Sequence, residues 1–140
     1  MKHTIITNSY EETQKLGADF ARKINLVSVL ALHGDLGSGK TTFIQGLAKG
    51  LGIERKIISP TFIIMRTYQI TPKTFYHVDL YRIKDEKDIR DLGLIDLMQE
   101  PQNLFAIEWP EKIKSLLPQK RLDIFFEYLD EDKRKITYEE

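Results

Sequence analysis

The residues best suited to chemistry lie at positions 34–41, which read G-x-x-x-x-G-K-T, the phosphate-binding loop of nucleotide triphosphatases. The glycines of such a loop allow a positive φ and let a ligand approach the backbone without meeting a Cβ atom. Successive N–H groups then point into one concavity and bind phosphate oxygens. The Lys40 ammonium is expected to bind the β- and γ-phosphates, and the Thr41 hydroxyl is expected to bind Mg²⁺. The loop therefore predicts a nucleoside triphosphate site.

Two carboxylates are candidates for the acidic partner that a phosphate loop needs to hold Mg²⁺. Asp79 ends the segment 75–78, and Glu108 ends the apolar segment 104–107. The carboxyl ends of parallel strands open into the crevice where open α/β sheets bind ligands. One carboxylate would hold Mg²⁺, directly or through water, while the other orients or deprotonates the attacking water. The sequence leaves the division of these roles open, and the structural alternative is that each carboxylate only caps the next segment.

Four other places carry weaker signals. Ser59 and Thr61, on either side of a proline, are candidates for sensing the γ-phosphate as switch segments do, although an ordinary proline turn explains the same spacing. Trp109 is more often a packing residue, but its place beside a candidate carboxylate makes it a possible neighbour of the nucleotide. His77 is interpreted as a packed or hydrogen-bonded histidine. The basic run 133–135 follows three acidic residues, which indicates a self-neutralised hairpin tip.

The identity of the nucleotide follows from motifs that the sequence lacks. A GTPase should carry an Asn/Thr-Lys-x-Asp segment for the guanine edge, and no such segment is present. A small-molecule kinase usually has several arginines in a lid and an acceptor site, whereas the arginines here are scattered along the chain. ATP is therefore the favoured nucleotide and water the favoured acceptor. Because no arginine is evident as a finger in cis, we predict slow hydrolysis by the isolated chain and stimulation by partners.

Hydrophobic periodicity predicts the elements that position these groups. A β-prone strand at 27–32 precedes the phosphate loop and a helix at 43–51 follows it, which is the context that the motif requires. Ser9 and Glu12 form an S-x-x-E capping box, which predicts one helix from Ser9 to Asn25. The other predicted elements are a strand at 4–7, a hairpin of strands 63–69 and 75–80, helices at 85–92, 94–98 and 111–117, a strand at 104–107, and a C-terminal hairpin at 122–138.

The whole chain is expected to form one domain, 1–140, that is long enough to bury a sizeable core. Lys+Arg and Asp+Glu are both 21, so a formal net charge of zero gives no basic excess for unaided binding of nucleic acid. The absence of cysteine excludes disulfides and cysteine zinc sites. No apolar run approaches the length of a membrane span, and the first residues lack the core of a signal peptide. We therefore expect a cytoplasmic protein with no membrane partner.

Four segments together resemble the bacterial TsaE (YjeE) family, the ATPase of tRNA threonylcarbamoyladenosine biosynthesis. The phosphate loop alone is shared by many families, whereas the combination of S-P-T-[FY], [HF]-x-D-L-Y-R and E-W-P is much more specific. The order and spacing of the segments cover most of the chain and end only near the C-terminal hairpin. The segments are 33–43, 59–62, 77–82 and 107–110.

This resemblance implies an α/β fold like that of P-loop NTPases, in which helices flank a central, mostly parallel sheet with antiparallel hairpin additions. It also implies ATP and Mg²⁺ as cofactors, and TsaB and TsaD as protein partners. In that system TsaD transfers a threonylcarbamoyl group to an adenosine beside the anticodon of certain tRNAs, and ATP hydrolysis by TsaE resets the TsaB–TsaD assembly between turnovers. The resemblance therefore implies that tRNA is contacted mainly through the partners.

The resemblance also implies roles for individual residues. Lys40, Asp79 and Glu108 form the implied catalytic set, and Thr41 with Glu108 serves Mg²⁺. The loop with Ser59 and Thr61 is switch-like. The implied nucleotide contacts are Leu36, Gly37, Ser38, Gly39, Lys40, Thr41, Thr42 and Trp109, with Tyr10 and Thr13 on the adenine side.

Two other function classes stay open from the sequence. One is a small phosphotransferase that acts on a metabolite. The other is a non-hydrolytic binding module, in which ATP occupancy alone drives association with a partner.

Overall fold

The computed structural model describes residues 1–57, 65–90 and 92–140, so the predicted switch residues Ser59 and Thr61 lie outside the described residues. The elements of the described chain are β1 (Lys2–Thr7), α1 (Tyr10–Asp19), α2 (Ala21–Val27), β2 (Val29–His33), α3 (Lys40–Gly50), β3 (Met65–Ile70), β4 (Lys73–Asp79), α4 (Glu86–Arg90), α5 (Leu94–Met98), β5 (Asn103–Glu108), the 3₁₀ helix η1 (Pro110–Leu116), β6 (Leu122–Tyr128) and β7 (Arg134–Glu139).

These strands form one mixed sheet in the order β1-β7-β6-β2-β5-β4-β3. The middle of the sheet is parallel, since β2 pairs in parallel with both β5 and β6, and β5 pairs in parallel with β4. Antiparallel pairs add β3 at one edge and β7 and β1 at the other. This confirms the predicted α/β fold with a mostly parallel centre and antiparallel hairpin additions, including the predicted pairing of both hairpins.

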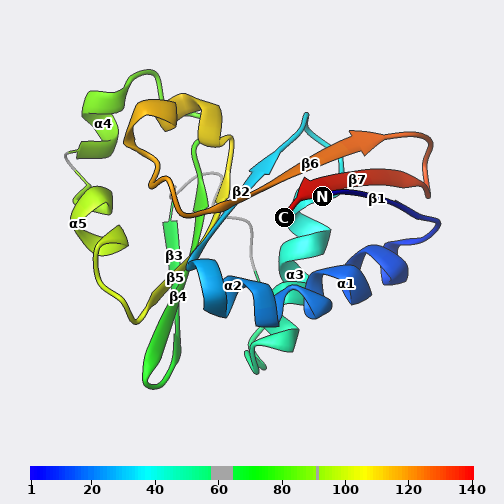
Figure 1. Cartoon of the computed structure of the whole chain (residues 1–140), viewed down its shortest axis with the longest axis horizontal. Helices are drawn as coiled ribbons and strands as arrows, with labels where there is room; N and C mark the ends of the chain where they lie inside the picture. The colour runs from blue at the N-terminus through cyan, green and yellow to red at the C-terminus, as the bar shows by residue number, and fades with distance from the viewer. Residues whose placement is uncertain (58–64, 91) are drawn as a thin grey trace.

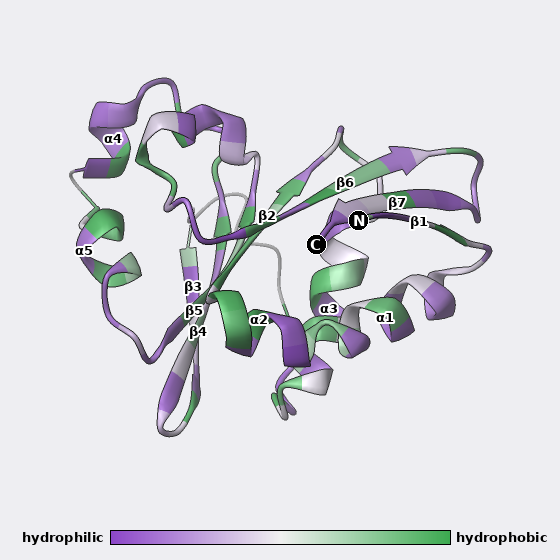
Figure 2. Cartoon of the chain, viewed as in Figure 1, coloured by the Kyte–Doolittle hydropathy of each residue, from purple (hydrophilic) through white to green (hydrophobic). Residues whose placement is uncertain are grey.

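Different helices cover the two faces of the central strands (Figure 1). Alternate residues of a strand point to opposite faces. In β5, Leu104 and Ala106 therefore join the core formed with α1, α2 and α3, while Phe105 and Ile107 join the core formed with α4, α5 and η1. Every residue of β5 is buried, as expected for a central parallel strand. Figure 2 shows the hydrophobic colour running along β2 at the centre of the molecule.

Helices α1 and α3 approach each other so closely that only glycine fits at two positions. A Cβ on Gly17 would lie 2.0 Å from the carbonyl oxygen of Phe43, and a Cβ on Gly46 would lie 1.8 Å from that of Gln14. Both distances are far below any real contact with backbone. The close packing fixes α3, and with it the phosphate loop at its N-terminus, against the first helix of the chain.

The single helix predicted from Ser9 to Asn25 is wrong, because the chain breaks at Phe20 into α1 and α2. The predicted start is confirmed, since the Ser9 hydroxyl accepts a hydrogen bond from the Glu12 N–H. At the break Phe20 is buried, with its ring 5.1 Å from that of Phe43 and 5.0 Å from that of Tyr138. These edge-on aromatic contacts with distant elements outweigh the local helical pattern.

Two smaller predictions also need correction. The strand predicted at 27–32 begins at Val29, because Val27 completes α2 and Ser28, with a φ of 70°, ends that helix in the left-handed conformation. The segment predicted as helix 111–117 is a 3₁₀ helix from Pro110 to Leu116, interrupted by non-helical angles at Ile113. In the described part of the chain, no helix has both the length and the apolar character needed to cross a membrane.

Candidate nucleotide site

The phosphate loop joins the end of β2 to the start of α3, as its sequence context predicts. Gly34, Gly37 and Gly39 have φ values of 149°, 79° and 103°, which residues other than glycine rarely adopt. Ser38 lies between them, and its buried Oγ has no hydrogen-bond partner among the described residues. A buried hydroxyl without a partner, inside a loop of this backbone shape, fits an anion such as a phosphate group.

Lys40 is the first residue of α3, and its side chain lies over the loop. It is buried, its Nζ donates to the carbonyl oxygen of Gly34, and the same Nζ lies 4.0 Å from the centre of the Trp109 ring. Burial lowers the pKa of the Lys40 ammonium, and the negative charges of Glu108 and Asp79 oppose this shift. The cation is thus held at the loop by a carbonyl and an aromatic face.

The two candidate carboxylates end neighbouring parallel strands. Asp79 is the last residue of β4, Glu108 is the last residue of β5, and the two are Cα partners in the sheet. Both side chains are buried. The Thr41 Oγ1 donates to Glu108 Oε2 across 3.4 Å, and Asp79 Oδ1 accepts the N–H of Tyr81 at 3.0 Å. Strand register therefore brings both carboxylates to the phosphate loop.

His77 takes part in the site through Glu108. Its Nε2 lies 2.7 Å from Glu108 Oε2, and both side chains are buried. The prediction that His77 is packed or hydrogen-bonded is therefore confirmed, but the sequence did not identify its partner. The sequence does contain a signal that His77 faces the site. His77 and Asp79 are residues i and i+2 of one strand, and such residues point to the same face of a sheet.

One pocket of about 370 Å³ unites most of the predicted site residues. Trp109 lines it in the left-handed conformation, with φ 60° and ψ 48°, where the chain turns from β5 into η1. The predicted site residues that line this pocket are Leu36, Gly37, Gly39, Lys40, Thr41, Thr42, Asp79, Glu108 and Trp109.

Arg134 also lines this pocket, and the sequence did not predict it. It belongs to the basic run 133–135, whose sequence pattern indicates a self-neutralised hairpin tip. No local pattern signals its position, because only the pairing of β7 with β6 and the pairing of β6 with β2 bring the hairpin to the loop. The described structure therefore places one arginine of the chain at the phosphate loop.

Three predicted contacts do not line the pocket, and the first is Ser38, which is buried within the loop. Thr13 is buried, and its hydroxyl bonds to that of Thr7 at 2.7 Å. Tyr10 is exposed, donates from its hydroxyl to Gln45 Oε1 at 2.7 Å, and lines a separate cavity beside the C-terminal end of α3. A role for Thr13 and Tyr10 on the adenine side stays a prediction.

The described residues contain no group of three or more His, Cys, Asp or Glu side chains that could hold a metal ion. A site with few protein ligands suits Mg²⁺, which usually keeps several waters and binds through one or two protein ligands together with substrate phosphates. In this pocket the Thr41 hydroxyl and the carboxylates of Glu108 and Asp79 carry the oxygen atoms for such a role, and Thr41 and Glu108 are hydrogen-bonded to each other.

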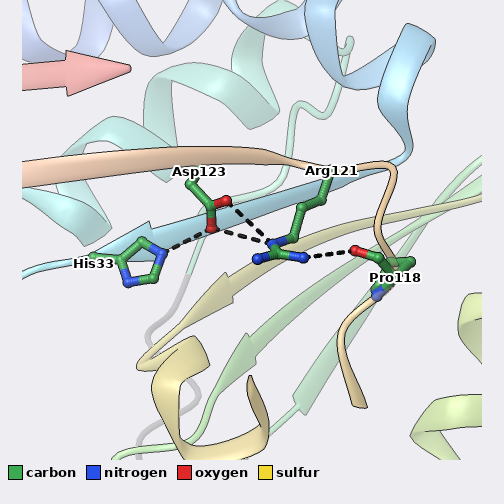
Figure 3. A network of polar contacts seen from close by, with 4 residues as sticks. All are labelled: His33, Pro118, Arg121 and Asp123. Carbon is green, nitrogen blue, oxygen red and sulfur yellow. Dashed lines mark hydrogen bonds and ion pairs between the residues drawn. The ribbon is translucent and has the colours of Figure 1, made fainter. Parts of the chain in front are cut away.

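A second polar network supports the strand that leads into the loop (Figure 3). His33 ends β2, and its Nε2 lies 2.9 Å from Asp123 Oδ1 of the neighbouring strand β6. The Arg121 Nε donates to the same carboxylate oxygen at 3.2 Å, and the Arg121 Nη1 donates to the carbonyl oxygen of Pro118 at 2.9 Å. These contacts tie the residue before Gly34 to the start of β6.

Comparisons with known proteins agree on one family. The model of the family described as "Threonylcarbamoyl adenosine biosynthesis protein TsaE" matches residues 7–136. The tRNA threonylcarbamoyladenosine biosynthesis protein TsaE of Bacillus subtilis is 45% identical over 131 residues, which cover 91% of this chain and 79% of that protein. The TsaE protein of Rickettsia bellii is 42% identical over 130 residues, which cover 92% and 89%. Among solved structures, YdiB of Bacillus subtilis matches with a TM-score of 0.77 and 33% identity, over 99% of this chain and 84% of that chain.

Proposed function

Because the chain belongs to the TsaE family of threonylcarbamoyl adenosine biosynthesis proteins, we propose that it is a Mg²⁺-dependent ATPase of tRNA threonylcarbamoyladenosine modification. The convergence of Lys40, Thr41, Asp79 and Glu108 on one pocket beside the phosphate loop carries this proposal. The proposed ATPase acts in the cytoplasm on an assembly of TsaB and TsaD, which make most of the contacts with tRNA. Hydrolysis supports repeated turnover of that assembly.

The proposed reaction is an in-line attack of water on the γ-phosphorus of ATP. The bond between this phosphorus and the β–γ bridging oxygen breaks, and ADP and inorganic phosphate are released. The Lys40 ammonium and the N–H groups of the loop stabilise the charge on the phosphate oxygens. Bound Mg²⁺ supplies further neutralisation of that charge. The hydrogen bond from Thr41 to Glu108 supports Glu108 as the Mg²⁺ partner, which leaves Asp79 to orient the water.

Reconstitution of tRNA modification with TsaB, TsaD and this chain tests the proposal. Lys40→Ala should lower the rate of ATP hydrolysis by about 100-fold or more, since it removes the main cation at the phosphates. It should also stop modification after the first turnover. Lys49→Ala, which changes an exposed lysine at the other end of the same helix, should behave like the unchanged chain. Repeated turnover by the Lys40→Ala variant would show that hydrolysis by this chain is dispensable.

Two further arms of this experiment separate the rival functions. A non-hydrolysable ATP analogue should fail to support repeated modification, whereas a binding module driven by occupancy alone would still work with it. Phosphate release should need no added metabolite, whereas a phosphotransferase would consume ATP only with its acceptor present.

A further inference from the structure

The side chain of Arg134 is fixed by the hairpin that carries it. Arg134 opens β7 and has Tyr128 of β6 as its Cα partner. Its Nη1 donates to the carbonyl oxygen of Asp130 at 2.6 Å and to that of Lys133 at 2.9 Å, and its Cζ lies 4.6 Å from the centre of the Tyr128 ring. The guanidinium is therefore held in one orientation by the β6–β7 turn.

The same side chain lies against the phosphate loop. A Cβ on Gly39 would lie 3.3 Å from Arg134 Cγ and 3.6 Å from Arg134 Nε. This Nε is buried and has no hydrogen-bond partner among the described residues. A buried N–H without an acceptor costs free energy, so this donor would gain from an acceptor at the loop. The hairpin thus presents an unused donor beside the loop.

Among the described residues Arg134 forms no salt bridge with a carboxylate. In the same turn, backbone N–H groups lower the pKa of the Asp130 carboxylate, and the charge of Arg134 helps to lower it. The hydrogen-bond and ring neighbours of Arg134 are carbonyls and an aromatic ring. Guanidinium groups bind phosphate oxygens through charge-assisted hydrogen bonds. An anion on the phosphate loop would therefore lie within the reach of a cation that is already oriented.

We propose that Arg134 binds a phosphate oxygen of the nucleotide on loop 34–41, so that the C-terminal hairpin is part of the nucleotide site. The inference rests on the proposed function, since it needs a nucleotide on that loop. Because the guanidinium is already tied to backbone carbonyls, it binds ground state and transition state alike. It therefore contributes to nucleotide affinity and not to turnover.

Nucleotide titration of Arg134 variants tests the proposal. Arg134→Met keeps the apolar stem against Tyr128 and removes the charge and the donors. It should raise the Kd of ADP and of tripolyphosphate by about tenfold, the loss of one charge-assisted contact, and should raise KM for ATP with little change in kcat. Arg134→Lys keeps the charge but not the planar guanidinium. Its Kd values should lie between those of the unchanged chain and those of Arg134→Met. Lys133→Met, a change of an exposed neighbouring cation, should stay within about twofold of the unchanged chain.

The melting temperature without nucleotide distinguishes a loss of nucleotide binding from a loss of stability in the β6–β7 turn. A variant that melts lower but binds ADP and tripolyphosphate as the unchanged chain does would overturn the proposal, and so would weaker binding of ADP with unchanged binding of tripolyphosphate. If Arg134→Met does not fold, the same comparison is made with Arg134→Lys. Undiminished ADP binding by Lys40→Ala would count against the nucleotide site itself, which distinguishes failure of the proposed function from failure of this inference.

Discussion

At the residue scale, Glu108 is held by hydrogen bonds from two sides. His77 lies 2.7 Å from Glu108 Oε2, and the Thr41 hydroxyl donates to the same oxygen across 3.4 Å. An ionised carboxylate only accepts hydrogen bonds, so the His77 Nε2 is the donor. The His77 Nδ1 is buried without a partner among the described residues, which agrees with the tautomer that carries its proton on Nε2. His77 thus fixes the position of the proposed Mg²⁺ partner.

His77→Phe should therefore lower kcat for ATP hydrolysis by about tenfold, because Glu108 loses the donor that fixes its position. The Kd of ADP should change less than about threefold, since the loop contacts stay in place. His77→Gln can still donate and should recover part of kcat. Steady-state kinetics and nucleotide titration measure both quantities.

Tyr76→Phe serves as the control, because it changes the adjacent residue of the same strand, which points to the opposite face. An unchanged kcat for His77→Phe, in a protein that melts normally, would show that Glu108 needs no support from His77.

At the same scale, the sequence predicted those site residues that belong to the loop motif or that end a predicted strand. Lys40 and Thr41 follow from the loop, and Asp79 and Glu108 follow from their places at strand ends, so their convergence could be expected. Arg134 could not be predicted, because its role depends on a sheet neighbour and not on the residues beside it in the chain.

At the element scale, α1 and α3 pack so closely that Gly17 and Gly46 have no room for a side chain. Glycine inside a helix normally costs about 1 kcal/mol relative to alanine. At Gly17 this preference is reversed, because an added methyl group would meet the Phe43 carbonyl at 2.0 Å. The pair of helices must move apart to accept any side chain at this position.

Gly17→Ala should consequently lower the free energy of unfolding by about 3 kcal/mol, the upper range for overpacked sites. Urea unfolding followed by circular dichroism measures this value. Lys15→Ala, on the exposed side of the same helix, should stay within about 0.5 kcal/mol of the unchanged chain. A stabilising Gly17→Ala would contradict the close packing of the two helices.

Elements were predictable where their signals are local. The Ser9 cap and the two hairpins depend on residues a few positions apart, and the structure confirms them. The break at Phe20 depends on Phe43 and Tyr138, which are distant in sequence. Hydrophobic periodicity does not register these contacts, so it predicts that the helix continues past Phe20. Tertiary packing of an aromatic ring decided this element boundary.

At the scale of the whole molecule, the sheet order brings together parts of the chain that are far apart in sequence. The loop after β2 lies between β5, which carries Glu108, and β6, whose partner β7 carries Arg134. Arg134 is tied to carbonyls of its own turn. It is therefore a poor candidate for an arginine that moves onto the γ-phosphate during hydrolysis.

The isolated chain should accordingly hydrolyse ATP slowly, and addition of TsaB and TsaD should raise kcat by about tenfold or more, since a charge supplied in trans can stabilise the transition state. Phosphate release measured with and without the two partners tests this expectation. TsaB alone and TsaD alone are the controls for effects of added protein. Fast turnover by the chain alone, unchanged by the partners, would contradict it.

The position of Trp109 gives the molecule its own optical probe. It is the single tryptophan of the sequence, and its ring lies 4.0 Å from the Lys40 ammonium in the pocket. Indole emission depends on nearby charge, and all of the emission comes from this one point. A nucleotide that draws Lys40 toward its phosphates would change the fluorescence of the unlabelled protein, so occupancy of the pocket could be followed in real time through the proposed ATPase cycle.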